Sequence, residues 1–132
     1  MVKKILVVDD EESIRTVLME AFKKAGYVVK AAESAEHALA ILKQESIMVN
    51  YFDLKLPGMS GKELCRQVRM QNPLAYICAI TGYTDLFGLL ECRKAGVDDF
   101  FQKPVTLSLL LLSAQEAFKR LERWKVDDYE PV

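Results

Sequence analysis

The chain of 132 residues is predicted to fold as one α/β domain around a parallel five-stranded sheet. Short apolar runs, several of them rich in β-branched residues, recur along the chain, as expected of strands buried on both faces. Segments with apolar residues at helical spacing alternate with these runs, and the short connections imply right-handed crossovers. The expected strands are residues 5–8, 27–29, 47–52, 76–80 and 100–101.

The first two expected helices cover residues 12–24 and 35–43. Gly26 follows the first as a stop, and Ser34 stands where an N-cap of the second would be. The first helix is expected to turn one apolar face to the core, formed by Ile14, Val17, Leu18, Ala21 and Phe22.

The remaining helices are expected to begin after Ser60, at residue 85 and at residue 107. Ser60 and Glu63 have the spacing of a capping box, and Leu64, Val68 and Met70 follow on the apolar face before Pro73 ends the segment. The fourth helix, residues 85–95, stops at Gly96, and the fifth, residues 107–125, follows Thr106 as a possible cap. The core stripe of the fifth helix is predicted to be Leu107, Leu110, Leu111, Ala114, Phe118 and Leu121.

Composition excludes several classes of protein. With 18 basic and 19 acidic residues the net charge is −1, which provides no electrostatic footprint for nucleic acid or an anionic membrane. No apolar stretch approaches the ~20 residues of a membrane span, and the apolar run near the N-terminus is too short for a signal peptide, so we expect a cytoplasmic protein. The three cysteines are widely spaced, which argues against structural zinc or disulfides and favours reduced, packed thiols.

Acidic, hydroxyl and amino side chains follow four of the expected strands. Asp9 and Asp10 follow the first, Asp53 the third, Thr81 the fourth and Lys103 the fifth. Because strand ends of one polarity lie along one edge of a parallel sheet, these side chains are expected to meet in one crevice. Three carboxylates so close together cannot all stay ionised without a cation among them.

This combination of groups suits a metal-assisted phosphoryl transfer. A carboxylate such as Asp53 can act as a nucleophile and accept a phosphoryl group. Asp10, with Asp9 nearby, is expected to hold Mg²⁺, which is bound by one or two carboxylates together with phosphate oxygens and water. Lys103 and the Thr81 hydroxyl can then bind other oxygens of the transferring group.

Four segments carry a more specific resemblance: ILVVDDE at residues 5–11, DLKLPGMSG at 53–61, ITGY at 80–83 and AGVDDFFQKP at 95–104. With them the chain resembles a receiver domain of two-component response regulators, of the stand-alone type, over nearly its whole length. The resemblance implies a flavodoxin-like, doubly wound sheet of order 2-1-3-4-5. We expect a receiver domain over residues 1–125 and a short tail over residues 126–132.

The resemblance also implies roles for individual residues. Asp53 would be phosphorylated by a histidine kinase, and Mg²⁺ would be bound by Asp10, Asp53 and the backbone carbonyl of Lys55, with Asp9 assisting through water. Thr81 and Phe100 would form a switch pair, and the Lys103–Pro104 peptide bond would be cis. Such a domain is not an enzyme toward other substrates, since it promotes only its own phosphorylation and dephosphorylation.

A surface for a partner is expected on the fourth helix, the fifth strand and the fifth helix. Leu109 and Leu112 lie off the core stripe of the fifth helix, and Leu86 and Leu90 share a face of the fourth helix with Arg93. These leucines are either scattered surface residues or a patch that binds a downstream protein or a second copy of the chain.

Three other functions stay open at this point. The chain could be a phosphorelay carrier, or the receiver part of a DNA-binding regulator whose output domain is absent. An FMN protein on the same fold is disfavoured, because the acidic loop at residues 9–13 would repel a phosphate group in the absence of a metal.

Overall fold

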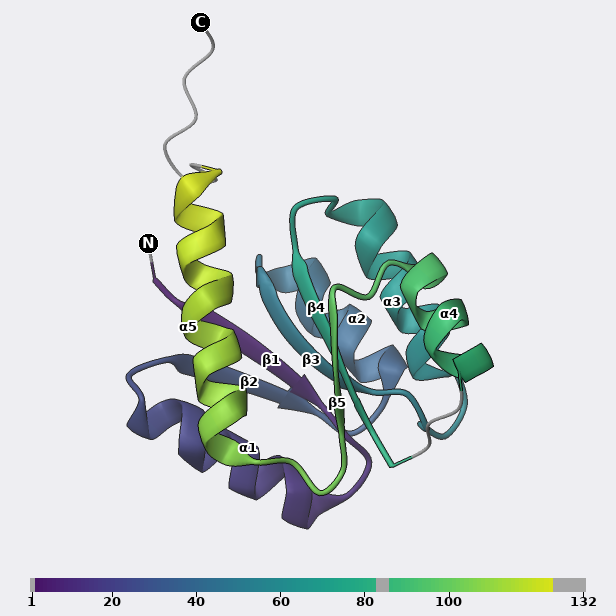
Figure 1. Cartoon of the computed structure of the whole chain (residues 1–132), viewed down its shortest axis with the longest axis horizontal. Helices are drawn as coiled ribbons and strands as arrows, with labels where there is room; N and C mark the ends of the chain where they lie inside the picture. The colour runs from purple at the N-terminus through teal and green to yellow at the C-terminus, as the bar shows by residue number, and fades with distance from the viewer. Residues whose placement is uncertain (1, 83–85, 125–132) are drawn as a thin grey trace, which may run out of the picture.

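The computed structural model describes residues 2–82 and 86–124, and for residues 86 and 87 it describes the backbone alone. Strands and helices alternate along the chain (Figure 1). In order they are β1 Lys4–Val8, α1 Glu12–Lys24, β2 Val28–Ala32, α2 Ala35–Gln44, β3 Val49–Asp53, α3 Gly61–Gln71, β4 Tyr76–Thr81, α4 Leu86–Ala95, β5 Asp99–Gln102 and α5 Leu107–Arg123.

The five strands form one parallel sheet in the order β2-β1-β3-β4-β5, which confirms the predicted fold class and topology. Helices α1 and α5 cover one face of the sheet, and α2, α3 and α4 cover the other (Figure 1). Of the described helices, none is both long and apolar enough to cross a membrane.

Alternate residues of each central strand pack against opposite helical layers. In β1, Ile5 and Val7 belong to the cluster with α1 and α5, whereas Leu6 and Val8 belong to the cluster with α2, α3 and α4. Each of these side chains is at most 1% exposed, and full burial of a side chain of this size contributes about 1.5–3 kcal/mol. The three cysteines are buried free thiols, as predicted.

The edge strand β2 differs from the expectation. It begins at Val28, one residue later than predicted, and continues through Lys30 to Ala32. Because β2 has a neighbouring strand on one side only, Val28 and Lys30 are exposed and the strand is not an uninterrupted apolar run. The apolar pattern therefore predicted a strand that was too short.

Three residues assigned to core faces are exposed: Val17 by 49%, Met70 by 78% and Leu107 by 38%. The sheet covers a narrower stripe of α1 than predicted, centred on Leu18 and Phe22 at a spacing of i and i+4. Met70 lies two residues beyond the buried Val68, which places it on the opposite side of α3. Leu107 shares the buried face of α5 but lies in its first turn, where it has helical neighbours on one side only.

The structure confirms some of the predicted helix caps. The Ser34 hydroxyl accepts from the His37 N–H at 3.2 Å, and the Ser60 hydroxyl accepts from the Glu63 N–H at 3.1 Å. The Glu63 carboxylate pairs with Arg66, so only half of the predicted capping box forms. Thr106 occupies the N-cap position of α5 without a side-chain cap bond. The predicted ends at residues 85 and 125 lie outside the described residues.

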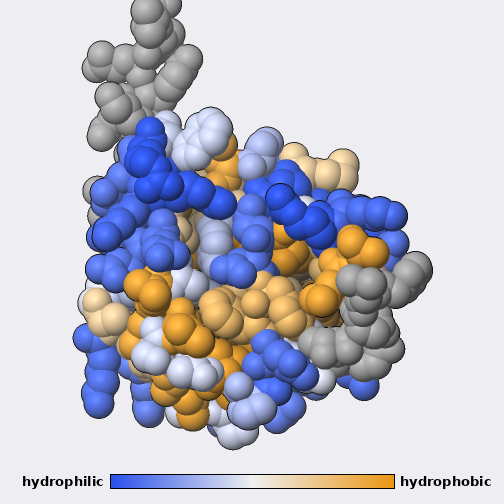
Figure 2. Space-filling model, viewed as in Figure 1, coloured by the Kyte–Doolittle hydropathy of each residue, from blue (hydrophilic) through white to orange (hydrophobic). Residues whose placement is uncertain are grey.

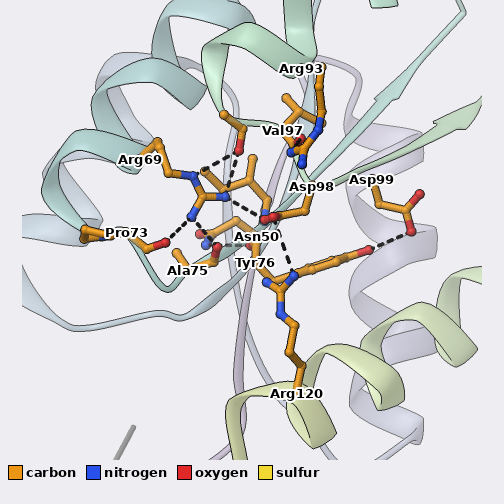
Figure 3. A network of polar contacts seen from close by, with 12 residues as sticks. Asn50, Arg69, Pro73, Ala75, Tyr76, Arg93, Val97, Asp98, Asp99 and Arg120 are labelled. Atoms are coloured by element: carbon orange, nitrogen blue, oxygen red, sulfur yellow. Dashed lines mark hydrogen bonds and ion pairs between the residues drawn. The ribbon is translucent and has the colours of Figure 1, made fainter. Parts of the chain in front are cut away.

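Arg69 ties α3 to the loops before β4 and β5 (Figure 3). Its guanidinium donates to the carbonyl oxygens of Pro73, Ala75 and Gly96 and to the Asp98 carboxylate, at 2.6–3.0 Å. The same Asp98 oxygen accepts from the Ile77 N–H at 2.8 Å. This network fixes the end of the sheet at which β4 and β5 begin.

Asn50 is a fully buried polar residue within β3. Its amide group donates to the carbonyl oxygens of Ile47 and Tyr76 at 3.4 and 3.3 Å. Among the described residues, the side-chain oxygen of Asn50 is the buried polar side-chain atom that has no hydrogen-bond partner. The donor half of the amide bridges β3 and β4, while the acceptor half destabilises the core.

A buried hydroxyl chain joins the sheet to α5. The Tyr51 hydroxyl lies 2.8 Å from the Ser113 hydroxyl, which donates to the Leu110 carbonyl at 2.6 Å, so Tyr51 donates to Ser113. Burial raises the pKa of Tyr51, which keeps its hydroxyl protonated. Phe22 packs on the Tyr51 ring with centroids 5.0 Å apart.

We predict that Ser113→Ala destabilises the fold by about 1–3 kcal/mol, because it leaves the buried Tyr51 hydroxyl without its acceptor. Tyr51→Phe should cost about 1 kcal/mol, and the double variant should cost less than the sum of the two, since it removes both members of the pair. Urea unfolding measures these differences. Ser108→Ala, at an exposed serine of the same helix, is the control; equal effects of the two serine substitutions would contradict the prediction.

Candidate functional site

A crevice lies at the carboxyl ends of the strands, where the sequence places its acidic and basic groups. We call it the acidic crevice; its volume is about 600 Å³. Its lining residues are Asp10, Glu11, Asp53, Lys55, Leu56, Pro57, Thr81, Gly82 and Lys103. Asp9, directly beside it, is 2% exposed.

The backbone of the sheet fixes the positions of these side chains. Asp53 and Thr81 are the last residues of β3 and β4. The strand ladder continues past the sheet, because the Asp9 N–H donates to the Ala32 carbonyl at 3.1 Å and the Lys103 N–H donates to the Thr81 carbonyl at 2.9 Å. The Lys103–Pro104 peptide bond is cis, as predicted.

Lys103 bridges two carboxylates in the crevice. Its ammonium nitrogen lies 2.9 Å from Asp9 Oδ2 and 3.1 Å from Asp53 Oδ2. The other Asp53 oxygen, Oδ1, accepts from the Lys55 N–H at 3.1 Å. The structure therefore brings together Asp9, Asp53 and Lys103, as the sequence predicted.

Burial and hydrogen bonding shift the pKa values of Asp53 and Lys103. It raises the pKa of Asp53, although hydrogen bonds from the Lys55 N–H and Lys103 act in the opposite direction, and the charge of Asp9 raises it further. Burial opposes the charge of Lys103, yet its hydrogen bonds to Asp9 and Asp53 raise its pKa overall. The Asp53 carboxyl is therefore harder to ionise than an ordinary aspartate, chiefly because it is buried.

The acids of the crevice fit a divalent metal ion. One oxygen from each of Asp9, Asp10 and Asp53 lies within 4.8 Å of the other two. Three carboxylates face one ammonium, so negative charge is in excess, and oxygen ligands are those that Mg²⁺ prefers. Lys55 lines the same crevice, but the role of its backbone carbonyl stays a prediction.

A second cavity lies behind Thr81, next to Phe100. We call it the apolar cavity; it has a volume of about 320 Å³ and its lining includes Leu54, Thr81, Gly88, Leu89, Cys92 and Phe100. Thr81 is 2% exposed and lines both spaces. Phe100 is half-buried and packs against the core cluster of α2, α3 and α4. The predicted switch pair therefore borders one cavity.

The sequence did not predict several residues that hold the loops of the crevice. Arg15 donates to the Asp9 carbonyl at 2.8 Å, and Glu36 on α2 accepts from the Met59 N–H at 3.0 Å. A Cβ at Gly61 would lie 2.1 Å from the Asp53 carbonyl oxygen, so a glycine is required where α3 starts beneath β3. The glycine stood in a recognised motif, whereas no sequence pattern pointed to Arg15 or Glu36.

A family model of the response regulator receiver domain matches residues 5–115. The chain belongs to the response regulator receiver family. The match runs from β1 to the middle of α5 and includes all four strand ends of the acidic crevice.

Solved and curated proteins resemble this receiver domain. A CheY-like response regulator receiver domain protein from Methanospirillum hungatei JF-1 has a TM-score of 0.88 and 31% identity, over 93% of this chain and 99% of that one. Sporulation initiation phosphotransferase F of Bacillus subtilis is 34% identical over 104 residues, 79% of this chain and 84% of that protein. A cyclic di-GMP phosphodiesterase of Thermotoga maritima is 35% identical over 115 residues, 87% of this chain.

The length of these relatives varies widely. The receiver domain spans 31% of the length of the phosphodiesterase, the first curated relative, and most of the length of the phosphotransferase.

The leucines predicted to bind a partner are exposed in the receiver domain wherever they are described. Leu90 is 53% exposed, Leu109 52% and Leu112 49%, whereas the side chain of Leu86 lies outside the described part. Figure 2 shows apolar side chains gathered over α4, β5 and the first half of α5. The interpretation as a single face, rather than scattered residues, gains support from this arrangement.

We predict that Asp53→Asn stabilises the metal-free receiver domain at neutral pH. A carboxyl whose pKa is raised on folding binds protons more readily in the folded state, so its ionisation costs stability as the pH rises through the raised pKa. An amide avoids this cost, although it weakens the contact with Lys103. The gain should vanish near pH 3, below the ordinary pKa of an aspartate. Chemical denaturation in EDTA at both pH values measures it; a variant less stable than the parent at neutral pH contradicts it.

Proposed function

We propose that Asp53 accepts a phosphoryl group from a phosphohistidine of a sensor kinase and that the chain signals through the resulting change of its surface. The bridging of Asp53 and Asp9 by Lys103 carries this proposal. A buried carboxylate and a cation lie side by side in an open crevice. The carboxylate can attack a phosphoryl group there, and the cation can bind its oxygens.

The transfer balances within the crevice. An oxygen of Asp53 attacks phosphorus, the phosphorus–nitrogen bond of the donor breaks, and the donor imidazole keeps the electron pair and takes up a proton. Lys103 can then donate to a phosphoryl oxygen in place of the Asp53 oxygen, and the Thr81 hydroxyl can donate to another. Hydrolysis of the acyl phosphate by water resets the domain, which acts on no other substrate.

Asp10 and Asp53 would hold Mg²⁺ together with the backbone carbonyl of Lys55, with Asp9 assisting through water. When bound, the metal ion offsets negative charge on the transferring group. The residues of the chain supply the remaining requirements: Asp53 the nucleophile, Lys103 the positive charge, and the Lys55 N–H a donor that orients the Asp53 carboxylate at 3.1 Å.

The output is proposed to be the face of α4, β5 and α5. Thr81 lines both the acidic crevice and the apolar cavity, so its movement toward a phosphoryl group would open space beside Phe100. Leu90, Leu109 and Leu112 lie on the neighbouring helices and would contact a downstream protein or a second copy of the chain.

A phosphorelay carrier is the second candidate. The observation in its favour is that the chain spans 84% of the length of a relative named as a phosphotransferase. In that role Asp53 would pass its phosphoryl group on to a histidine of a second protein, with the contact on α1 and the loops around the crevice.

We predict that a small acyl phosphate with Mg²⁺ adds one phosphoryl group to the chain and that Asp53→Asn abolishes the addition, because no other nucleophile occupies this position. Asp10→Asn should slow it by at least about tenfold through loss of a metal ligand. Intact mass over time measures both. Asp99→Asn, at an exposed aspartate on β5, is the control; labelling of Asp53→Asn at the parental rate would refute the assignment.

We predict that Leu90→Glu and Leu109→Glu each weaken phosphorylation-dependent self-association or partner binding, because each buries a charge in an apolar contact. Phosphorylation itself should proceed at the parental rate. Sedimentation and pull-down with phosphorylated protein measure the contact, with Met70→Glu on α3 as the control at an apolar residue that is even more exposed. Normal binding by both leucine variants would move the contact to α1 and favour the carrier role.

A further inference from the structure

Gly88 lies in the first turn of α4, which begins at Leu86. A glycine in a helix is destabilising relative to alanine, because it loses more conformational freedom on folding. Gly88 lines the apolar cavity together with Leu89 and Cys92 of the same helix. Gly88 and Cys92 are four residues apart on the helix face that borders the cavity, so a side chain at position 88 would take up space there.

The apolar cavity is placed to receive an aromatic ring. Phe100 lines it and is half-buried, so its ring can exchange a partly exposed position for an enclosed one. Thr81 and Lys55 line both this cavity and the acidic crevice, where Asp53 lies. Any residue that narrows the cavity from the side of α4 would therefore act on the same ring as the movement of Thr81.

We propose that Gly88 sets the room available to Phe100 and thereby determines whether phosphorylation of Asp53 can change the α4 surface. The inference rests on the proposed function and names the residue that controls it. A side chain at position 88 would occupy part of the cavity, keep Phe100 in its outer position and uncouple the surface from the crevice.

A different role for Gly88, as a point of helix flexibility, makes a different prediction. Alanine and leucine have similarly high helix propensity, so both would stiffen α4 to a similar degree. They differ in volume. If space is what matters, Gly88→Leu abolishes the response and Gly88→Ala weakens it, whereas a loss of flexibility affects both alike.

Cys92 provides a reporter within the cavity. It is 6% exposed and lines the apolar cavity, whereas Cys65 and Cys78 are fully buried. The experiment measures the rate at which a small thiol reagent labels Cys92, located by peptide mass, with and without excess acyl phosphate and Mg²⁺. In the parent protein, phosphorylation should slow labelling several-fold, because the Phe100 ring fills the space beside the thiol.

The variants should differ in how fast Cys92 is labelled. Gly88→Leu is labelled slowly in both states, although intact mass shows that Asp53 still takes up its phosphoryl group. Phe100→Ala is labelled rapidly in both states. Lys94→Leu, which places the same side chain on an exposed position of α4, responds like the parent.

Two results overturn the inference. One is a Gly88→Leu variant that is phosphorylated and still shows the parental change in Cys92 labelling. The other is an equal loss of that change in Gly88→Ala and Gly88→Leu, which assigns Gly88 to helix flexibility. Failure of the parent to gain mass would instead contradict the proposed function, and the slow labelling of unphosphorylated Gly88→Leu would still test whether position 88 opens onto the cavity.

Discussion

The excess of negative charge at the carboxyl edge of the sheet constrains the rest of this molecule. Parallel strands deliver Asp9 and Asp53 to adjoining positions, where both are at least 95% buried. Lys103 neutralises one charge by bridging both carboxylates, at 2.9 and 3.1 Å. Asp10 adds a further negative charge to the cluster, so a cation from solution is needed to complete the balance.

One end of the sheet is held by a network of polar contacts, and the other end carries the acidic crevice. At the end where β4 and β5 begin, Arg69 binds three carbonyl oxygens and Asp98, and Arg120 lies over the Tyr76 ring at 5.3 Å (Figure 3). At the opposite end the polar groups surround an open crevice. A rigid base of this kind would let the first turn of α4, near Gly88, respond as proposed, because the last turn is anchored beside Gly96.

The sequence predicted the parallel sheet and the meeting of Asp9, Asp53 and Lys103, because strand polarity alone places their ends together. Helical periodicity was less informative: Val17 and Met70 are exposed, since periodicity indicates a face but not how much of it the sheet covers. Glu63 pairs with Arg66 instead of completing a capping box, a competition that spacing cannot resolve.

Several contacts that depend on the folded chain could not be predicted from the sequence. Arg15 on the Asp9 carbonyl and Glu36 on the Met59 N–H hold the loops of the crevice, yet surface charges on helices are ordinarily solvated. The unpaired oxygen of Asn50 is likewise a property of the assembled core. The significance of Gly88 depends on a cavity that exists only once α4 has packed against β5.

The most direct test of the charge balance is the Mg²⁺ affinity of Lys103→Met, measured by isothermal titration calorimetry at neutral pH beside the parent. Removal of the ammonium leaves Asp9 and Asp53 without their bridge and increases the excess negative charge. The variant should therefore bind Mg²⁺ more tightly than the parent, although it has lost a group that assists phosphoryl transfer. Weaker or unchanged binding would contradict the account, because it would mean that Lys103 does not share its carboxylates with the metal site.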